Sequence, residues 1–117
     1  CLLWAGTGPA LAIAEHEQNL QNKAMQYFQQ GLAAEQAGDL HAAQELFRKS
    51  IGQWARFKEV HYKLGLVSAK LGNNDEAMGE FRQALNIDNN FVQCRNDYAL
   101  FQKLNKDNVN EAMNQWK

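Results

Sequence analysis

Apolar residues recur at helical spacing through most of the chain, in segments separated by short polar turns. The predicted helices cover, approximately, residues 18–37, 40–54, 56–71, 75–87 and a last segment from residue 91. Gly38 supplies a helix stop and Asp39 an N-cap between the first two segments. The last segment is expected to turn at residues 105–108. The pattern therefore predicts an all-α fold built from helical hairpins.

Acidic and amide residues gather at the boundaries of the predicted helices. Asn73 with Glu76 resembles a capping box, and residues 88–90 are expected to form the turn into the next helix. Helix geometry separates Asp75 from Asp88 by about 20 Å, which is too far for a shared metal ion. These residues are therefore interpreted as helix boundaries, and no metal site is expected.

The hairpins repeat one another with a fixed period. Shifted by 34 residues, segment 24–57 matches segment 58–91 at seven identical positions, where composition alone predicts about two. The identical pairs are Gly31/Gly65, Leu32/Leu66, Gly38/Gly72, Ala43/Ala77, Phe47/Phe81, Arg48/Arg82 and Phe57/Phe91. A third copy begins at Val92, and its second half, residues 110–117, echoes residues 75–82 at a shift of 35. Such periodicity is typical of solenoids, in which each repeat buries its apolar face against the next.

A helix-turn-helix repeat of this length resembles the tetratricopeptide repeat, TPR. A small residue is required where the first helices meet, and this position holds Gly31, Gly65 and Ala99. The alanine and aromatic residue of the second helix are Ala43 and Phe47, Ala77 and Phe81, and Ala112 and Trp116 in the third copy. Ala55 and Asn89 replace the usual late proline, and Tyr27 and His61 replace the early tryptophan. The resemblance implies a right-handed α-solenoid with two full repeats, residues 24–57 and 58–91, and a partial third, residues 92–117.

The resemblance also implies a concave groove, lined by the first helix of each pair. The groove positions are Met25, Phe28, Leu32, Glu35 and Gln36; Glu59, Tyr62, Leu66, Ala69 and Lys70; and Gln93, Asn96, Leu100, Lys103 and Leu104. Phe28 and Leu32 replace the lysine and asparagine with which chaperone-binding relatives clamp a terminal carboxylate, so that activity is not expected. An exposed apolar stripe is predicted instead, formed by Phe28, Leu32, Tyr62, Leu66 and Leu100. It suits an amphipathic helix or extended peptide, unless the N-terminal segment or a further C-terminal helix covers it.

Residues 1–14 carry no charge and differ from the rest of the chain, while residues 15–23 lead into the first predicted helix. Fourteen residues are too few to span about 30 Å of hydrocarbon, and residues 6–9 are expected to interrupt a helix. Three interpretations remain open: a signal remnant cleaved after Ala14, a lipoprotein terminus acylated on Cys1, or an apolar tail packed against the domain or a partner. Two of the three predict an extracytoplasmic protein, periplasmic or membrane-associated, with membrane contact through residues 1–14.

Composition and charge exclude several function classes. The chain of 117 residues, 45% of them hydrophobic, suffices for one domain, and its net charge of −1 argues against binding of nucleic acid. Cys94 is expected to be a core residue, because Cys1 is the only other cysteine and no C-x-x-C pair occurs. No catalytic motif is present; His41 is expected to be solvated and His61 to be buried. We therefore expect neither an enzyme nor a cofactor.

Two functions fit these observations. The first is a protein-interaction adaptor whose groove binds a helix or extended peptide of a partner protein, in assembly of an envelope or membrane complex. The second is a permanent structural subunit of a large membrane-associated assembly, with residues 1–14 and the repeat surface as fixed contacts.

Overall fold

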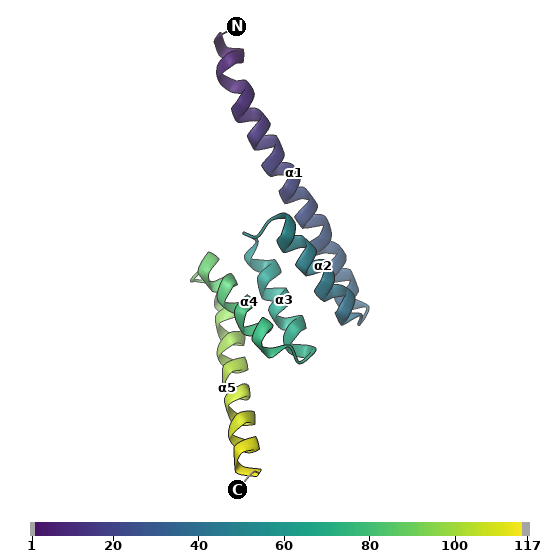
Figure 1. Cartoon of the computed structure of the whole chain (residues 1–117), viewed down its shortest axis with the longest axis vertical. Helices are drawn as coiled ribbons and strands as arrows, with labels where there is room; N and C mark the ends of the chain where they lie inside the picture. Colours follow the sequence, from purple (N-terminus) through teal and green to yellow (C-terminus); the bar gives the residue numbers. More distant parts are fainter. Residues whose placement is uncertain (1, 116–117) are drawn as a thin grey trace.

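Five α-helices make up the part of the chain that the structure describes. The computed structural model describes the backbone of residues 2–115 and the side chains of residues 10–106. The helices are α1 (Leu2–Gln36), α2 (Leu40–Gln53), α3 (Lys58–Lys70), α4 (Asn74–Ile87) and α5 (Val92–Gln115). Each helix packs against the next one along the chain, and the array measures 79 × 30 × 21 Å (Figure 1). The all-α solenoid of paired helices predicted from the sequence is confirmed.

Two equivalent glycines end α1 and α3. Gly38 and Gly72 both adopt φ of +85°, which favours glycine because other residues carry a Cβ atom that is strained there. The backbone N–H of Asp39 donates to the Ala34 carbonyl at 2.9 Å, and that of Asn73 donates to the Ser68 carbonyl at 2.8 Å. Asp39 also caps α2, as predicted, because its carboxylate accepts from the Ala42 N–H at 3.1 Å.

The start of α4 differs from the sequence prediction. Asn73 is the N-cap residue, but its side chain makes no capping hydrogen bond. The carboxylate of Glu76 instead accepts from Arg48 Nη2 at 2.6 Å, from Arg48 Nε at 3.0 Å and from Gln44 Nε2 at 3.3 Å. The predicted capping box is therefore wrong, because α2 offers Glu76 a two-point charged donor that is stronger than one backbone N–H. Glu76 joins the two repeats instead of capping its own helix.

Phe47 and Phe81 lie at the centres of two similar core clusters. They are 0% and 1% exposed, and each is contacted closely by a glycine of its own repeat. A Cβ atom on Gly31 would lie 2.5 Å from the Phe47 ring. The clusters are Ala43, Phe47, Val60, Leu64 and Val67, and then Tyr62, Ala77, Phe81, Ala84 and Cys94. Each cluster joins successive helix pairs, so the predicted interior roles of both phenylalanines and of Cys94 are confirmed.

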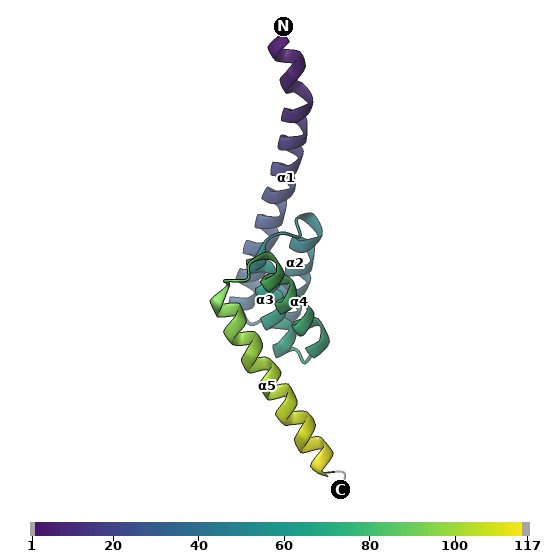
Figure 2. The ribbon, with the colours of Figure 1, turned by 90° about the vertical axis from the view of Figure 1, so that its left-hand side faces the viewer.

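Helix α1 starts much earlier than predicted. It runs without a break from Leu2, so the expected interruption at residues 6–9 and the expected lead-in at residues 15–23 are both wrong. Pro9 removes one backbone hydrogen bond near the helix start, and the helix-favouring residues after it continue the helix. The first half of α1 projects away from the body (Figures 1 and 2), and residues 10–19 are all exposed. For residues 10–14, a tail packed against the domain is therefore wrong, and these residues do not cover the groove.

Helix α5 continues through the turn predicted at residues 105–108. Both turns inside the helix pairs use a glycine with positive φ, and residues 105–108 contain no glycine that could adopt this conformation. The third copy therefore forms one long helix over the described backbone, not a hairpin. Ala99, which corresponds to Gly31 and Gly65, is exposed there. The side chain of Ala112 and all of Trp116 lie outside the described residues.

Candidate partner-binding groove

Apolar hollows lie along the first helices of the repeats, α1, α3 and α5, and we call the shared face of these helices the groove. The hollow between α1 and α3 has a volume of about 240 Å³. It is lined by Met25, Phe28, Phe57, Glu59 and Val60. The hollow between α3 and α5 has a volume of about 180 Å³. It is lined by Leu66, Ala69, Phe81, Asp97, Leu100, Phe101 and Leu104.

The predicted groove residues fall into three classes of exposure. The exposed ones are Met25, Gln36, Glu59, Lys70, Gln93, Asn96, Leu100, Lys103 and Leu104. The half-buried ones are Phe28, Leu32, Glu35, Leu66 and Ala69. Tyr62 alone is buried. Among the apolar groove residues, exposure is greatest on α5, where Leu100 is 56% and Leu104 52% exposed.

Tyr62 corrects the prediction of a continuous exposed stripe. Its ring lies between α3 and α5, with ring centroids 5.1 Å from Phe91 and 6.3 Å from Phe81. Its hydroxyl donates to the Asp97 carboxylate, and burial together with this carboxylate raises the pKa of the Tyr62 hydroxyl. Tyr62 therefore joins α3 to α5 and interrupts the predicted exposed stripe. Sequence periodicity missed this because the covering residues Phe81, Phe91 and Asp97 lie outside α3.

The charges along the groove are asymmetric. Glu35 of α1 and Lys63 of α3 form an ion pair at 3.3 Å that crosses between the two helices. Lys70 and Lys103, near the hollow between α3 and α5, make no ion pair with any side chain that the structure describes. Glu59 lies at the opposite hollow. Two exposed lysines therefore lie near the hollow between α3 and α5, where Asp97 contributes a carboxylate, and the exposed Glu59 lies at the hollow between α1 and α3.

Three aromatic residues that line the groove hollows were not among the predicted groove positions. Phe57 and Phe101 line one hollow each, and Phe81 forms the floor of the second. The identity between Phe57 and Phe91 in the repeat alignment was the available signal for Phe57. The family's groove positions did not include these residues because Phe57 precedes α3, Phe81 lies on α4, and Phe101 lies on α5 between two of the counted positions.

The two histidines of the helix pairs behave differently. His41 is exposed and His61 is buried, and both predictions are confirmed. His61 Nδ1 lies 2.6 Å from Glu80 Oε2, and Nε2 lies 2.7 Å from the Ala55 carbonyl oxygen. Burial lowers the pKa of His61, but the hydrogen bonds to Glu80 and Ala55 and the charge of Glu80 outweigh it, so the pKa is raised. Among the described side chains, no group of three or more His, Cys, Asp or Glu residues could hold a metal ion.

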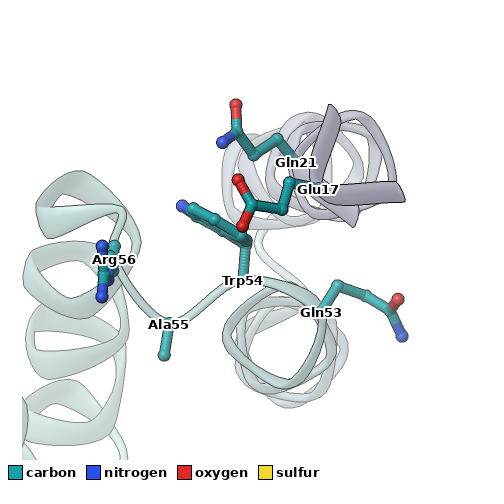
Figure 3. Close-up of a pocket in the computed structure, with 6 residues that line it drawn as sticks. All are labelled: Glu17, Gln21, Gln53, Trp54, Ala55 and Arg56. Carbon is teal, nitrogen blue, oxygen red and sulfur yellow. The ribbon is translucent and has the colours of Figure 1, made fainter. Parts of the chain in front are cut away.

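A larger hollow lies away from the groove, between α1 and the connection from α2 to α3, and we call it the notch (Figure 3). It has a volume of about 590 Å³ and is lined by Glu17, Gln21, Gln53, Trp54, Ala55 and Arg56. Figure 3 shows the Trp54 indole directed toward Glu17 and Gln21 of α1. None of these residues was predicted to line a site, because the notch exists only where two elements distant in sequence meet.

Over the residues that the structure describes, no helix combines the length and the apolar character needed to cross a membrane.

Comparison with known proteins identifies the repeats. A tetratricopeptide repeat family model matches residues 58–91, and a second tetratricopeptide repeat model matches residues 27–52. Together the two matches cover slightly more than half of the chain. No curated protein sequence matches the chain.

Solved structures share the fold at low sequence identity. A crystal structure of MamA aligns with TM-score 0.69 and 23% identity over 72% of this chain and 49% of that chain. A second MamA structure aligns with TM-score 0.69 and 22% identity, covering 97% of this chain and 63% of that one. The second TPR of Spaghetti (RPAP3), bound to HSP90 peptide SRMEEVD, aligns with TM-score 0.74 and 19% identity, covering 87% and 93%. This chain thus spans about half the length of the first MamA chain.

The two family matches span the glycine–phenylalanine contacts of both helix pairs, and the solved structures share the fold. The chain belongs to the tetratricopeptide repeat family, whose repeats are scaffolds for protein–protein interaction.

Proposed function

We propose that the groove binds an amphipathic helix or an extended apolar peptide of a partner protein. The observation that carries this proposal is the exposure of Leu100 and Leu104, 56% and 52%, beside the hollow lined by Leu66 and Phe101. Burying a leucine fully is worth about 1.5–3 kcal/mol, so a partner that covers both residues gains several kcal/mol from this hollow alone. The hollow between α1 and α3, which is lined by Met25 and Phe28, provides a second apolar contact.

The peptide-bound relative supports a groove of this fold as a peptide site, since its structure holds the HSP90 peptide SRMEEVD. The chemistry differs in this chain, because Phe28 and Leu32 are half-buried apolar residues packed on the first core cluster. An apolar ligand therefore fits better than a strongly acidic one. The basic residues Lys70 and Lys103 favour a ligand with acidic groups at the α5 end only.

The proposed context is assembly of an envelope or membrane complex outside the cytoplasm. Leu11 and Ile13 are 56% and 62% exposed on the projecting half of α1, which supports a contact of this segment with a membrane or a neighbouring subunit. A signal remnant and an acylated Cys1 remain the two extracytoplasmic interpretations of residues 1–14. Mass spectrometry of the native protein separates them, because acylation adds mass at Cys1 and signal cleavage removes residues 1–14.

The same exposed segment favours a second candidate, a permanent structural subunit of a membrane-associated assembly. Copurification with other subunits in fixed stoichiometry at high salt supports this candidate, whereas concentration-dependent, reversible peptide binding supports the adaptor. Neither function involves catalysis, a cofactor or nucleic acid.

Display selection of peptides against the purified chain tests the groove. We expect selected peptides to lose affinity at least tenfold on Leu100→Glu, because a buried, unpaired carboxylate at the contact costs more than the 1.4 kcal/mol that a factor of ten requires. Ile87→Glu is the matched control, because Ile87 is 42% exposed on α4, outside the groove. Tyr62 is unsuitable for this test because it is buried. Equal binding to both variants would exclude the groove as the peptide site.

A further inference from the structure

His61 lies where α3, α4 and the connection between α2 and α3 meet. Its side chain is 7% exposed. Nδ1 is 2.6 Å from the Glu80 carboxylate of α4, and Nε2 is 2.7 Å from the carbonyl oxygen of Ala55 in the connection, residues 54–57. Among the hydrogen bonds that the structure describes, the one between His61 Nε2 and Ala55 is the only one that joins a side chain to the backbone of the connection.

Both hydrogen bonds require His61 to carry two ring protons. A carboxylate and a carbonyl oxygen only accept hydrogen bonds, so both ring nitrogens must donate, and only the imidazolium ion can do so. A neutral ring keeps one N–H. The favoured neutral tautomer keeps the proton on Nδ1, because a bare Nδ1 would direct its lone pair at the Glu80 carboxylate. Nε2 then loses its proton, and its lone pair faces that of the Ala55 oxygen at 2.7 Å, which is repulsive.

Loss of the hydrogen bond between His61 and Ala55 affects residues at both the notch and the groove. Trp54 precedes Ala55 and forms a wall of the notch opposite Glu17 (Figure 3). Phe57 lies two residues after Ala55 and lines the hollow between α1 and α3. A shift of the Ala55 backbone therefore displaces one aromatic residue on either side, one at each hollow.

The other charged groups around His61 do not replace Glu80. Arg56 of the connection is exposed, and Lys58 of α3 forms an ion pair with Asp88. Glu59, also on α3, is exposed at the hollow between α1 and α3. Glu80 of α4 is thus the carboxylate that holds the protonated ring.

We propose that His61 is a proton-dependent latch: when protonated it ties the connection to α4, and when neutral it releases Ala55, so that Trp54 moves and the notch changes shape. The raised pKa of His61 supports this device, since it keeps the latch closed at a pH where an ordinary imidazole is already neutral. The latch acts within the fold and does not depend on which partner occupies the groove.

The test follows one tryptophan and one histidine in the full chain. Trp4 and Trp116 are replaced by phenylalanine, so that Trp54 is the only tryptophan, and its emission is recorded from about pH 5 to about pH 9 while NMR follows the His61 ring. We expect the two transitions to share one midpoint. Glu80→Gln should lower that midpoint by about one pH unit, because the ring loses its carboxylate.

His61→Gln should abolish the Trp54 transition, and His41→Gln, at an exposed histidine, is the matched control that should leave it unchanged. Circular dichroism shows whether His61→Gln folds, and Glu80→Gln carries the test if it does not. A constant Trp54 emission across the pH range in which His61 loses its proton would overturn the latch. So would a midpoint that Glu80→Gln leaves in place.

Discussion

Gly65 and Phe81 are in such close contact that a Cβ atom on Gly65 would lie 2.8 Å from the phenylalanine ring. Gly65→Ala must therefore move α3 or α4, and we expect it to destabilise the protein by about 1–3 kcal/mol. Gly79→Ala is the control in the same repeat, because no atom lies within 4 Å of the position that its Cβ would occupy. It should stabilise α4 by about 0.5–1 kcal/mol. Urea unfolding measures both, and a Gly65→Ala variant as stable as the parent would contradict the close packing of the helix pair.

Truncation of Phe81 should be the most damaging single change. The ring is 1% exposed and lies within 6 Å, centroid to centroid, of both Tyr98 and Phe101 at 5.9 Å. Phe81→Ala is expected to cost about 3–5 kcal/mol, a large fraction of the 5–15 kcal/mol that typically stabilises a domain. Leu100→Ala, at a 56% exposed site, should change stability by less than about 0.5 kcal/mol. A thermal midpoint that falls by less than a few degrees in Phe81→Ala would refute the repeat core.

Removal of the hydrogen bond from Tyr62 to Asp97 is expected to lower the stability of the interface between α3 and α5. Tyr62→Phe removes a hydrogen bond to a charged acceptor and leaves the half-buried Asp97 carboxylate without it, at a cost of about 1.5–3 kcal/mol. Tyr98→Phe is the control, because the Tyr98 hydroxyl makes no hydrogen bond within the described residues. Both free energies come from denaturant titration. Equal stability of the two variants would mean that the bond does not stabilise the interface.

The ion pair between Arg48 and Glu76 predicts charge coupling between the repeats. Glu76 is 25% exposed and Arg48 42%, so water screens the pair and we expect a coupling of about 0.5–1 kcal/mol. Arg48→Glu and Glu76→Arg should each destabilise, and the double reversal should recover most of the loss. The coupling should shrink at high salt. Arg82→Glu, at the equivalent exposed position of the second repeat, is the control; a similar loss there would indicate a nonspecific charge effect.

His61 predicts a loss of stability on the alkaline side. Burial lowers its pKa, but the bonds to Glu80 and Ala55 outweigh burial, so the folded pKa lies above the ordinary value of 6.5. A raised folded pKa gives a contribution that is complete below about pH 6.5 and is lost as the pH rises through the folded pKa. Unfolding free energy measured over this range should fall in the parent and stay level in Glu80→Leu, which removes the charge and the acceptor. A parent curve parallel to that variant would contradict the assigned protonation.

The sequence by itself predicted the local features of the two full repeats. The period of 34 residues, the glycine stops at Gly38 and Gly72, and the pairing of Gly31 and Gly65 with an aromatic residue were all readable from the chain. These features recur in the two full copies, because each of these repeats must end one helix and pack the next one closely against it.

Only the tertiary structure decided how neighbouring repeats use their polar and aromatic residues. Glu76 does not form the expected cap because Arg48 approaches it from another helix, and Tyr62 is not part of an exposed stripe because Phe91 and Asp97 contact it. Both ring nitrogens of His61 contact oxygen atoms because α4 and the connection bring a carboxylate and a carbonyl group to the ring. Periodicity reports the face of a helix on which a residue lies, whereas burial and charge depend on the groups that distant segments bring to that face.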